Sequence, residues 1–403
     1  MEQENSVNIL EDTSGADQKE ATDKLPREFI GKTGAGKIKI NVPERITINS
    51  SLDEIFVFAR KKKATDVHIS VDIPIFFRVS GVLKPQTEEK VMAEEFKRII
   101  SRMLTNEQLN IFNIKRDLEL VYVIEGAGRF RVTLVKKNPG WDLTARLIPM
   151  ELCSFKESGM PESCLELTNW AQGMVLVTGP AGCGKTTTLS ILCEMINHSR
   201  TDHIITIEQP IEFVFTPKKA RISQRELKLH TFSQDTALRA ALRQDPDIIV
   251  ISELRDPSMI QLAATAAETG HLVLGTMNTN DAAQTILRIV NSFSYTDRSL
   301  VQNMIAESLR GVICQQLVPR KDGTGVVPAF ELIMVNLAVA NLIRKGSAEQ
   351  IIQVISTGAA EGMITMDKSL MKLLKSGIIS WDEAYRRSVN KRDFAKLRHL
   401  SFK

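Results

Sequence analysis

A glycine-rich loop that ends in lysine and threonine constrains the fold of this chain more than any other feature. The loop reads Gly179-Pro180-Ala181-Gly182-Cys183-Gly184-Lys185-Thr186 and fits the pattern GxxxxGK[ST]. The apolar run 175–178 precedes it, and the helix-forming run 187–197 follows it. Glycines let the backbone N–H groups of such a loop surround phosphates, and the helix N-terminus adds a favourable dipole. The sequence therefore predicts a phosphate-binding loop between a strand and a helix of an α/β sheet.

The side chains of this loop predict how a nucleotide is held. We expect Lys185 to contact the β- and γ-phosphates of ATP and the Thr186 hydroxyl to ligate Mg²⁺. The complete predicted nucleotide-binding set is Gly179, Pro180, Ala181, Gly182, Cys183, Gly184, Lys185, Thr186 and Thr187.

An earlier stretch, residues 31–37, also fits GxxxxGK. The next residue, Ile38, offers no hydroxyl to a metal, and no apolar strand precedes the stretch. It follows residues 1–25, which carry seven acidic and two basic side chains and almost no large apolar ones. Such a composition cannot bury enough surface to offset the entropy of ordering. We therefore expect residues 1–48 to be a disordered tail that includes a flexible basic linker.

Two carboxylates are candidates for the chemistry. Transfer of a phosphoryl group from MgATP needs a residue that organises the metal and one that orients the attacking water. Glu208 ends the apolar run 204–207, and Glu253 ends the run 248–252. Parallel sheets bind their ligands at the carboxyl ends of the strands. Either carboxylate alone could cap the next helix, but the two together after a phosphate loop predict a catalytic pair.

Hydrophobic patterning predicts the organisation of the rest. Ser51 and Glu54 have the spacing of a capping box, so a helix is expected from there to Lys63. Strand-like and helical runs alternate in the second half of the chain, which predicts a parallel sheet between helices. The predicted divisions are a tail (1–48), an α+β domain (49–149), a linker (150–162), a P-loop core (163–335) and a helical C-terminal subdomain (336–403).

Composition argues against several classes of protein. A formal net charge of +4 and 5% aromatic residues predict neither a basic groove nor a stacking platform, so no nucleic-acid partner is expected. Five cysteines without a CxxC pair argue against a disulfide framework and a structural zinc site. The N-terminus lacks the pattern of a secretory signal, and Pro328 and polar residues interrupt the apolar stretch 326–343, which we interpret as a core strand and helix. A cytoplasmic location is expected.

Three further segments resemble the type II/type IV secretion ATPase family, and among its members the PilT-type pilus-retraction ATPases of twitching motility. The segments are Thr206–Glu212, similar to the aspartate box, Asp245–Asp256, similar to the Walker B segment, and Thr265–His271, similar to the histidine box. The resemblance extends in consistent order from Ser51 to Lys396, and the four-cysteine zinc insert of the pilus-extension and secretion members is absent.

The resemblance implies a fold and a set of roles. The fold is α/β, with a RecA-like P-loop NTPase core and its parallel sheet, a smaller PAS-like α+β domain before it and a helical subdomain after it. Glu208 would polarise the attacking water, Glu253 would hold Mg²⁺ through water, and His271 would lie near the γ-phosphate as a sensor. An arginine from a neighbouring subunit or the first domain would stabilise the developing charge. Arg131, Arg239 and Arg243 occupy matching places, and we take Arg243 as the candidate, although a surface ion pair explains each equally well.

The resemblance also implies partners. It predicts a homo-hexamer with ATP between subunits, an inner-membrane pilus or secretion platform protein, and a location peripheral to the inner membrane through such partners. A paralogous ATPase is a further candidate partner.

The chain departs from the family pattern at four positions. They are Gln209, Ser252, Asn278 and Ala340, where the family has Asp, Gly, a second His and Arg. Because Lys185, Glu208 and Glu253 are kept, we expect ATP hydrolysis by a motor of the retraction type. The alternatives are a weakly active or non-hydrolysing regulatory paralogue and a DNA-associated motor.

Overall fold

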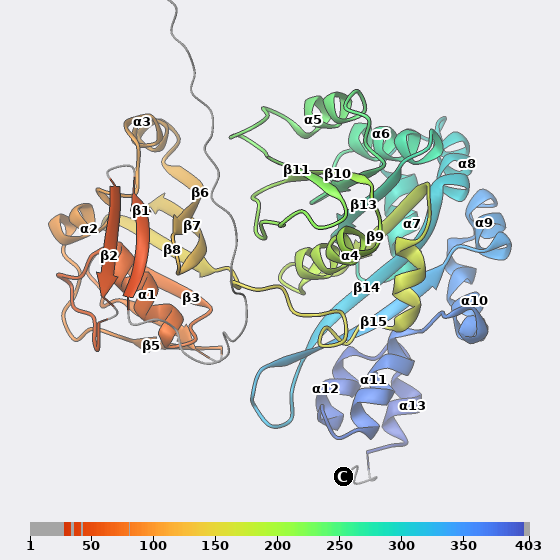
Figure 1. Cartoon of the computed structure of the whole chain (residues 1–403). Coiled ribbons are helices and arrows are strands. Elements are labelled where there is room, and N and C mark those ends of the chain that lie inside the picture. Colours follow the sequence, from red (N-terminus) through yellow and green to blue (C-terminus); the bar gives the residue numbers. More distant parts are fainter. Residues whose placement is uncertain (1–27, 34–35, 42, 80, 399–403) are drawn as a thin grey trace, which may run out of the picture.

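The computed structural model describes residues 28–33, 36–41, 43–79 and 81–398. Two parts that each contain a sheet lie side by side and are joined by an extended segment, and a group of small helices follows the second part (Figure 1). Most of the expected tail, residues 1–27, lies outside the described residues.

The segment that we expected to be a flexible linker contains two strands. β1 (Glu28–Thr33) pairs antiparallel with β2 (Gly36–Asn41), so this expectation was wrong. Lysine and isoleucine alternate through β2, which is the period of a strand and was obscured by the polar composition. The first match to GxxxxGK therefore spans the connection of two antiparallel strands and lacks the strand–helix junction of a phosphate loop; its central residues, 34–35, lie outside the described ones.

The N-terminal domain is a six-stranded antiparallel sheet with three helices. Its strands follow the order β5-β4-β3-β8-β7-β6. Their bounds are β3 Asp66–Ser70, β4 Phe76–Val79, β5 Val82–Pro85, β6 Asp117–Ile124, β7 Gly128–Lys136 and β8 Trp141–Leu147, and the helices are α1 Leu52–Lys61, α2 Ala93–Ile100 and α3 Asn106–Lys115. The predicted capping box is confirmed, since Ser51 accepts a hydrogen bond from the backbone of Glu54 and the Glu54 side chain accepts from the backbone of Ser51.

The core domain is built on a seven-stranded sheet of order β11-β10-β12-β13-β9-β14-β15. The strands are β9 Gly173–Thr178, β10 His203–Glu208, β11 Arg221–Glu226, β12 Ile248–Ile251, β13 Leu272–Met277, β14 Leu309–Pro319 and β15 Val326–Met334. All pairings are parallel except that of β14 with β15. The predicted parallel sheet is therefore confirmed, with one antiparallel edge strand.

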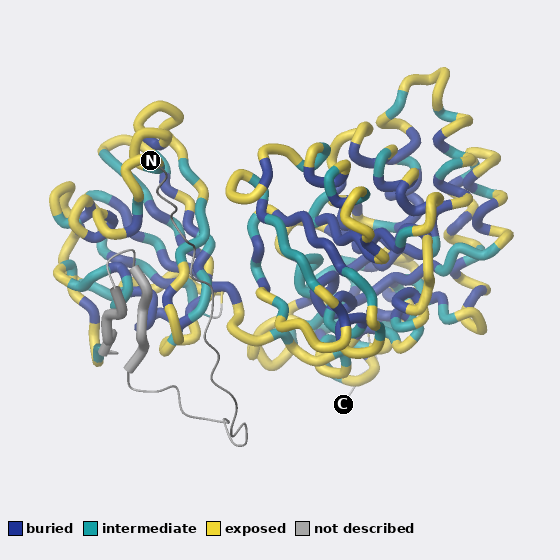
Figure 2. The backbone as a smooth tube through the Cα atoms, turned by 45° about the horizontal axis from the view of Figure 1, so that its top comes forward, coloured by how far each residue is buried: buried dark blue, intermediate teal, exposed yellow. Residues whose placement is uncertain are grey.

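Helices cover both faces of this sheet. They are α4 Lys185–Ser199, α5 Gln234–Ala241, α6 Pro257–Glu268, α7 Ala282–Asn291 and α8 Arg298–Ser308, with a 3₁₀ segment at Glu162–Thr168. Met174 and Leu176 of β9 pack with α6 and α8, whereas Val175 and Val177 pack with α4 on the other face. The central strands are thus buried along their whole length, as Figure 2 shows in dark blue, which explains their continuous apolar sequences.

Small helices complete the chain. They are α9 Leu337–Arg344, α10 Ile351–Thr357, α11 Met366–Lys375, α12 Trp381–Arg387 and α13 Lys391–Ala395, with 3₁₀ turns at Ala348–Gln350 and Gly358–Glu361. α9 and α10 pack into the larger core, whereas α11 to α13 surround a separate cluster that includes Phe394. None of the described helices has the length and apolar character that crossing a bilayer requires.

The aromatic core of the N-terminal domain gives a prediction about stability. Phe56 is 0% exposed and stacks on Phe130 with ring centroids 4.6 Å apart. Phe56→Ala should lower the free energy of unfolding of this domain by about 3–5 kcal/mol, because it leaves a cavity. Urea unfolding followed through Trp141, which packs on Phe112, measures this. The matched control, Phe232→Ala, removes a side chain that is 98% exposed and should leave the midpoint unchanged; equal effects would contradict the assignment of this core.

Candidate active site

The carboxyl ends of four neighbouring strands form the candidate site. In the order β10-β12-β13-β9 these strands lead into Glu208, Glu253, Asn278 and the phosphate loop. Neighbouring strands lie about 4.8 Å apart, so the strand of Glu253 is roughly 10 Å from that of the loop. The structure therefore brings the predicted carboxylates and the loop to one edge, and β13 places Asn278 between them.

The glycines of the phosphate loop adopt backbone conformations that a side chain would disturb. Gly179 has φ +148°, and a Cβ there would lie 2.3 Å from the carbonyl oxygen of Gln315 on β14. Gly184, with φ +91°, is the N-cap of α4. Glycine adopts positive φ angles of this kind without a steric penalty, whereas residues with a Cβ are strained there. The loop can therefore curve tightly above the sheet and present its N–H groups to a phosphate.

The loop lysine lies across the loop itself. The Nζ of Lys185 donates to the carbonyl oxygens of Gly179 and Pro180, both at 2.9 Å. An ammonium group held this way keeps its charge directed at the concave side of the loop, which suits the β- and γ-phosphates. Thr186 and Thr187 follow in the first turn of α4 and are partly exposed.

The phosphate loop is also held by a residue that sequence reasoning missed. Gln315 on β14 is buried; its amide nitrogen donates to the carbonyl oxygen of Cys183, and its amide oxygen accepts from the hydroxyl of Thr188 at 2.6 Å. One side chain thus ties the loop to the helix that follows it. The available signal was a glutamine pair, 315–316, inside an apolar strand sequence.

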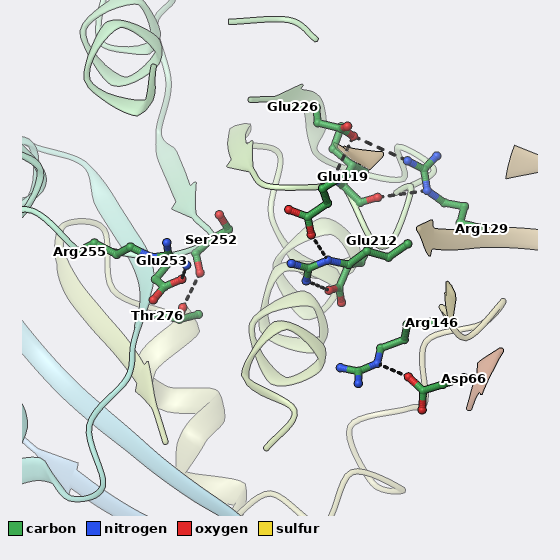
Figure 3. A network of polar contacts seen from close by, with 12 residues as sticks. Asp66, Glu119, Arg129, Arg146, Glu212, Glu226, Ser252, Glu253, Arg255 and Thr276 are labelled. Atoms are coloured by element: carbon green, nitrogen blue, oxygen red, sulfur yellow. Dashed lines mark hydrogen bonds and ion pairs between the residues drawn. The ribbon is translucent and has the colours of Figure 1, made fainter. Parts of the chain in front are cut away.

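Glu253 lies in a polar, hydrogen-bonded setting. Its carboxylate accepts from the guanidinium of Arg255 at 2.5 Å and from the side-chain amide of Asn278 at 2.5 Å. The hydroxyl of Thr276 donates to the carbonyl oxygen of Ser252, which joins the ends of β12 and β13 (Figure 3). Asn278, where the family has histidine, therefore orients Glu253 without carrying a proton that titrates near neutral pH.

Glu208 has a different environment. It is 7% exposed, and its carboxylate accepts from the hydroxyl of Thr206 at 2.6 Å and the side-chain amide of Gln224 at 2.9 Å. Burial raises the pKa of Glu208 to about 7; these hydrogen bonds lower it, and the neighbouring carboxylates Glu212 and Glu226 raise it. A carboxylate whose pKa lies near neutrality is suited to exchange a proton with water.

His271, the predicted γ-phosphate sensor, does not lie at this edge within the chain. It precedes β13, and its carbonyl oxygen accepts from the backbone of Gly173 at the start of β9. The phosphate loop follows the other end of β9, about 20 Å away for six residues of strand. The His271 ring bonds the carbonyl oxygen of Ala266 at the end of α6, which is a structural contact. Asn278 occupies the end of β13 that faces the site.

The three candidate arginines lie in different places. Arg243 follows α5 and is exposed; it lies at the edge of the sheet where β12 begins, opposite the edge of the phosphate loop. Arg239, on α5, pairs with Asp235 at 2.8 Å. Arg131, on β7 of the N-terminal domain, pairs with Glu119 at 2.6 Å and lies 4.0 Å from Glu212 of the core. Arg131 is thus the one of these three arginines that lies near Glu212, an acidic residue of the core.

The remaining departures have clear surroundings. Gln209 is exposed beside the buried Glu208. Ala340, on α9, is 8% exposed and packs in the core of the larger domain, where the arginine of the family pattern would have to be accommodated differently.

The side chains that would hold a metal offer oxygen atoms. Among the described residues no three His, Cys, Asp or Glu side chains gather as a metal site. The predicted donors, the Thr186 hydroxyl and the Glu253 carboxylate, are of the kind that Mg²⁺ prefers, and Mg²⁺ usually takes further ligands from water and substrate phosphates. The residues present therefore fit a metal that arrives with a nucleotide.

Comparison with known proteins gives the family of the chain. The family described as "Type II/IV secretion system protein" matches residues 43–386. A "Twitching motility protein" of Neisseria gonorrhoeae is 42% identical over 313 residues, 78% of this chain and 84% of its own length. The "Type IV pilus retractation ATPase PilT" of Pseudomonas aeruginosa is 38% identical over 333 residues, 83% of this chain and 96% of its own length.

A solved structure is similar over most of the chain. The crystal structure of the pilus retraction motor PilT with bound ADP superposes with a TM-score of 0.78 and 35% identity, and it covers 86% of this chain and 99% of that protein. The predicted α/β fold with a parallel sheet is thereby confirmed.

Gln315 gives a prediction about nucleotide binding. Gln315→Leu leaves the carbonyl of Cys183 and the hydroxyl of Thr188 without their hydrogen-bond partner. This should destabilise the present conformation of the phosphate loop by about 1–3 kcal/mol. We expect the dissociation constant for ATP to rise about tenfold in isothermal titration calorimetry, since 1.4 kcal/mol corresponds to that factor. Gln316→Leu, at the next position of β14, is the matched control and should bind ATP as the parent does. Unchanged affinity in the Gln315 variant would show that the loop holds its shape alone.

Proposed function

The chain belongs to the type II/IV secretion system protein family and is an ATPase of that family, and from this premise we propose that it is a motor of the pilus-retraction (twitching motility) type. It would couple hydrolysis of MgATP to movement of the N-terminal domain (49–149) against the P-loop core (163–335). The single observation that supports this most is the shared sheet edge, where the phosphate loop, Glu253 and Glu208 lie at the ends of neighbouring strands.

Each side chain of the edge then has a task in hydrolysis. The loop residues and Lys185 bind and orient the phosphates, and the Thr186 hydroxyl and Glu253 would hold Mg²⁺, which supplies charge neutralisation at the phosphates. Glu208 orients the attacking water and accepts its proton, since its carboxylate is buried among neutral donors. Asn278 and Arg255 keep Glu253 in one orientation.

The assembly that we propose is a homo-hexamer with ATP between subunits. The developing charge of the transition state requires a cation, and Arg243, which is exposed, would supply it from a neighbouring copy. The further partners that we propose are an inner-membrane pilus or secretion platform protein and a paralogous ATPase. Attachment to the inner membrane would occur through such a partner, from the cytoplasmic side.

A regulatory paralogue that binds ATP without turnover has less support. The departures at Gln209, Asn278 and Ala340 motivate this alternative. The intact Lys185, Glu208 and Glu253 argue against it. The exposure of Gln209 and the hydrogen bond from Asn278 to Glu253 support the active motor over this alternative.

Steady-state ATPase activity tests the proposed function. We expect turnover by the purified chain, loss of nucleotide binding in Lys185→Ala, and a decrease in kcat of at least about 100-fold in Glu208→Gln and Glu253→Gln, the range for loss of a general base or metal ligand. Glu349→Gln, which changes an exposed carboxylate far from the edge, is the matched control. Tight ATP binding without turnover in the parent would favour the regulatory paralogue, and turnover stimulated by DNA would favour a DNA motor.

The environment of Glu208 predicts the pH dependence of turnover. The carboxylate must be ionised to accept a proton, and its pKa is raised to about 7. We therefore expect kcat to fall as the pH drops through about 7, approaching tenfold for each unit below it. The residual rate of Glu208→Gln should be flat over the same range, because its amide does not titrate. The fall of kcat on the acidic side of this pH profile is its acidic limb. If kcat, measured at saturating ATP, instead falls near the ordinary pKa of a glutamate, the role assigned to Glu208 is contradicted.

A further inference from the structure

Two buried carboxylates lie side by side at the end of the sheet. Glu208 and Glu226 end β10 and β11, which pair in parallel with these two residues as register partners. They are 7% and 6% exposed. Two anions at the spacing of neighbouring strands in a buried place repel one another, and the pair is stable in the ionised form only when a cation or hydrogen bonds compensate.

The compensating cation comes from the other domain. The Nη2 of Arg129 on β7 lies 3.8 Å from the carboxylate of Glu226, and its Nε donates to the carbonyl oxygen of Ile211 at 3.1 Å (Figure 3). The backbone N–H of Ile211 donates to the same carboxylate of Glu226 at 3.1 Å. Both backbone groups of Ile211, three residues after Glu208, are therefore tied to this contact between domains.

Arg129 is itself held in place within the N-terminal domain. The guanidinium of Arg60 on α1 donates to the carbonyl oxygens of Arg129 and Ile148 at 3.3 and 2.9 Å, and it lies 4.9 Å above the ring of Phe130. Arg129 is therefore fixed relative to the rest of the N-terminal domain and would move with it.

We propose that Arg129 is a positioning residue for Glu208: by neutralising Glu226 and holding the turn after Glu208, it makes the charge state of Glu208 depend on docking of the N-terminal domain on the core. The inference rests on the proposed function, in which Glu208 accepts the proton of the attacking water. When the domain moves away, the charge of Glu226 is no longer offset by Arg129, and Glu208 keeps its proton. Glu208 then cannot accept a proton, and hydrolysis waits for the domain to dock.

Other charged and titratable groups around Glu208 do not replace Arg129. Glu212, on the turn, raises the pKa of Glu208, as does Glu226. The buried thiol of Cys193 on α4 also faces Glu208; its pKa is raised by burial, so it is neutral. Arg131 and Arg146 of the N-terminal domain act on Glu212. Burial lowers the pKa of Arg129, and the charges of Glu226 and Glu208 raise it; its guanidinium contacts Glu226.

The test uses the full chain and the pH profile of kcat. Arg129→Gln removes the cation and should move the acidic limb to higher pH by at least about one unit, the usual effect of one nearby opposite charge. Glu226→Gln removes the like charge and should move the limb to lower pH. The double variant should return the limb to within about half a unit of the parent, because the two changes offset one another. The KM for ATP should stay within twofold throughout.

The rescue by the second substitution separates this proposal from other roles of Arg129. A guanidinium that touched the nucleotide would raise KM when removed, and Glu226→Gln would restore nothing; that result overturns the proposal. Arg98→Gln, on α2 of the same domain, removes an exposed arginine that bonds a single backbone carbonyl and should leave the profile unchanged. If circular dichroism shows that Arg129→Gln folds poorly, the test rests on Glu226→Gln alone. An acidic limb that does not move in Glu226→Gln overturns the proposal as well.

Failure of the proposed function looks different. A parent without turnover, or full activity in Glu208→Gln, would refute the role of Glu208 and this inference with it. An active parent and an inactive Glu208→Gln, together with unshifted profiles in the Arg129 and Glu226 variants, would refute this inference alone.

Discussion

The parallel register that joins β9 to β13 and β14 is the constraint on which the site depends. In a parallel sheet every strand points the same way, so the segments that leave β9, β10, β12 and β13 all emerge at one edge. The strands can be parallel because helices bury both faces of the sheet. The phosphate loop then needs support from below, which Gln315 of β14 supplies through Cys183 and Thr188.

At this edge the same residue type has two environments. The carboxylate of Glu253 accepts hydrogen bonds from the guanidinium of Arg255 and the side-chain amide of Asn278. Glu208 is buried, accepts from neutral donors and lies beside Glu226, so its pKa rises. The two environments suit different tasks: Glu253, held by a guanidinium and an amide, can face a metal, and Glu208 can exchange a proton with water.

The contact between the N-terminal domain and the core is made by charged residues close to the carboxyl edge of the sheet. The acidic residues Glu212 and Glu226 belong to the core, whereas Arg129 and Arg131 belong to β7 of the N-terminal domain. Interfaces between domains of one chain are usually more polar than obligate interfaces, and relative motion of the domains is the general expectation for them. In a motor of the proposed kind, such a contact would report the position of one domain to the carboxylates of the other.

The sequence alone determined the phosphate loop, the strands on either side of it and the two carboxylates at strand ends, because each depends on local pattern: glycine spacing, apolar runs and the residue that ends a run. It did not predict β11 as a strand, because Arg221–Glu226 lies at an edge and is polar. It placed His271 by its position in a motif, whereas the direction of β13 puts it at the opposite end of the sheet. Gln315, Asn278 and Arg129 could not be assigned from spacing, since the residues that they contact are 25 to 132 positions away in the chain. Contacts of that kind exist only after the strands have paired and the domains have met, so the tertiary structure alone decided which side chains orient the site.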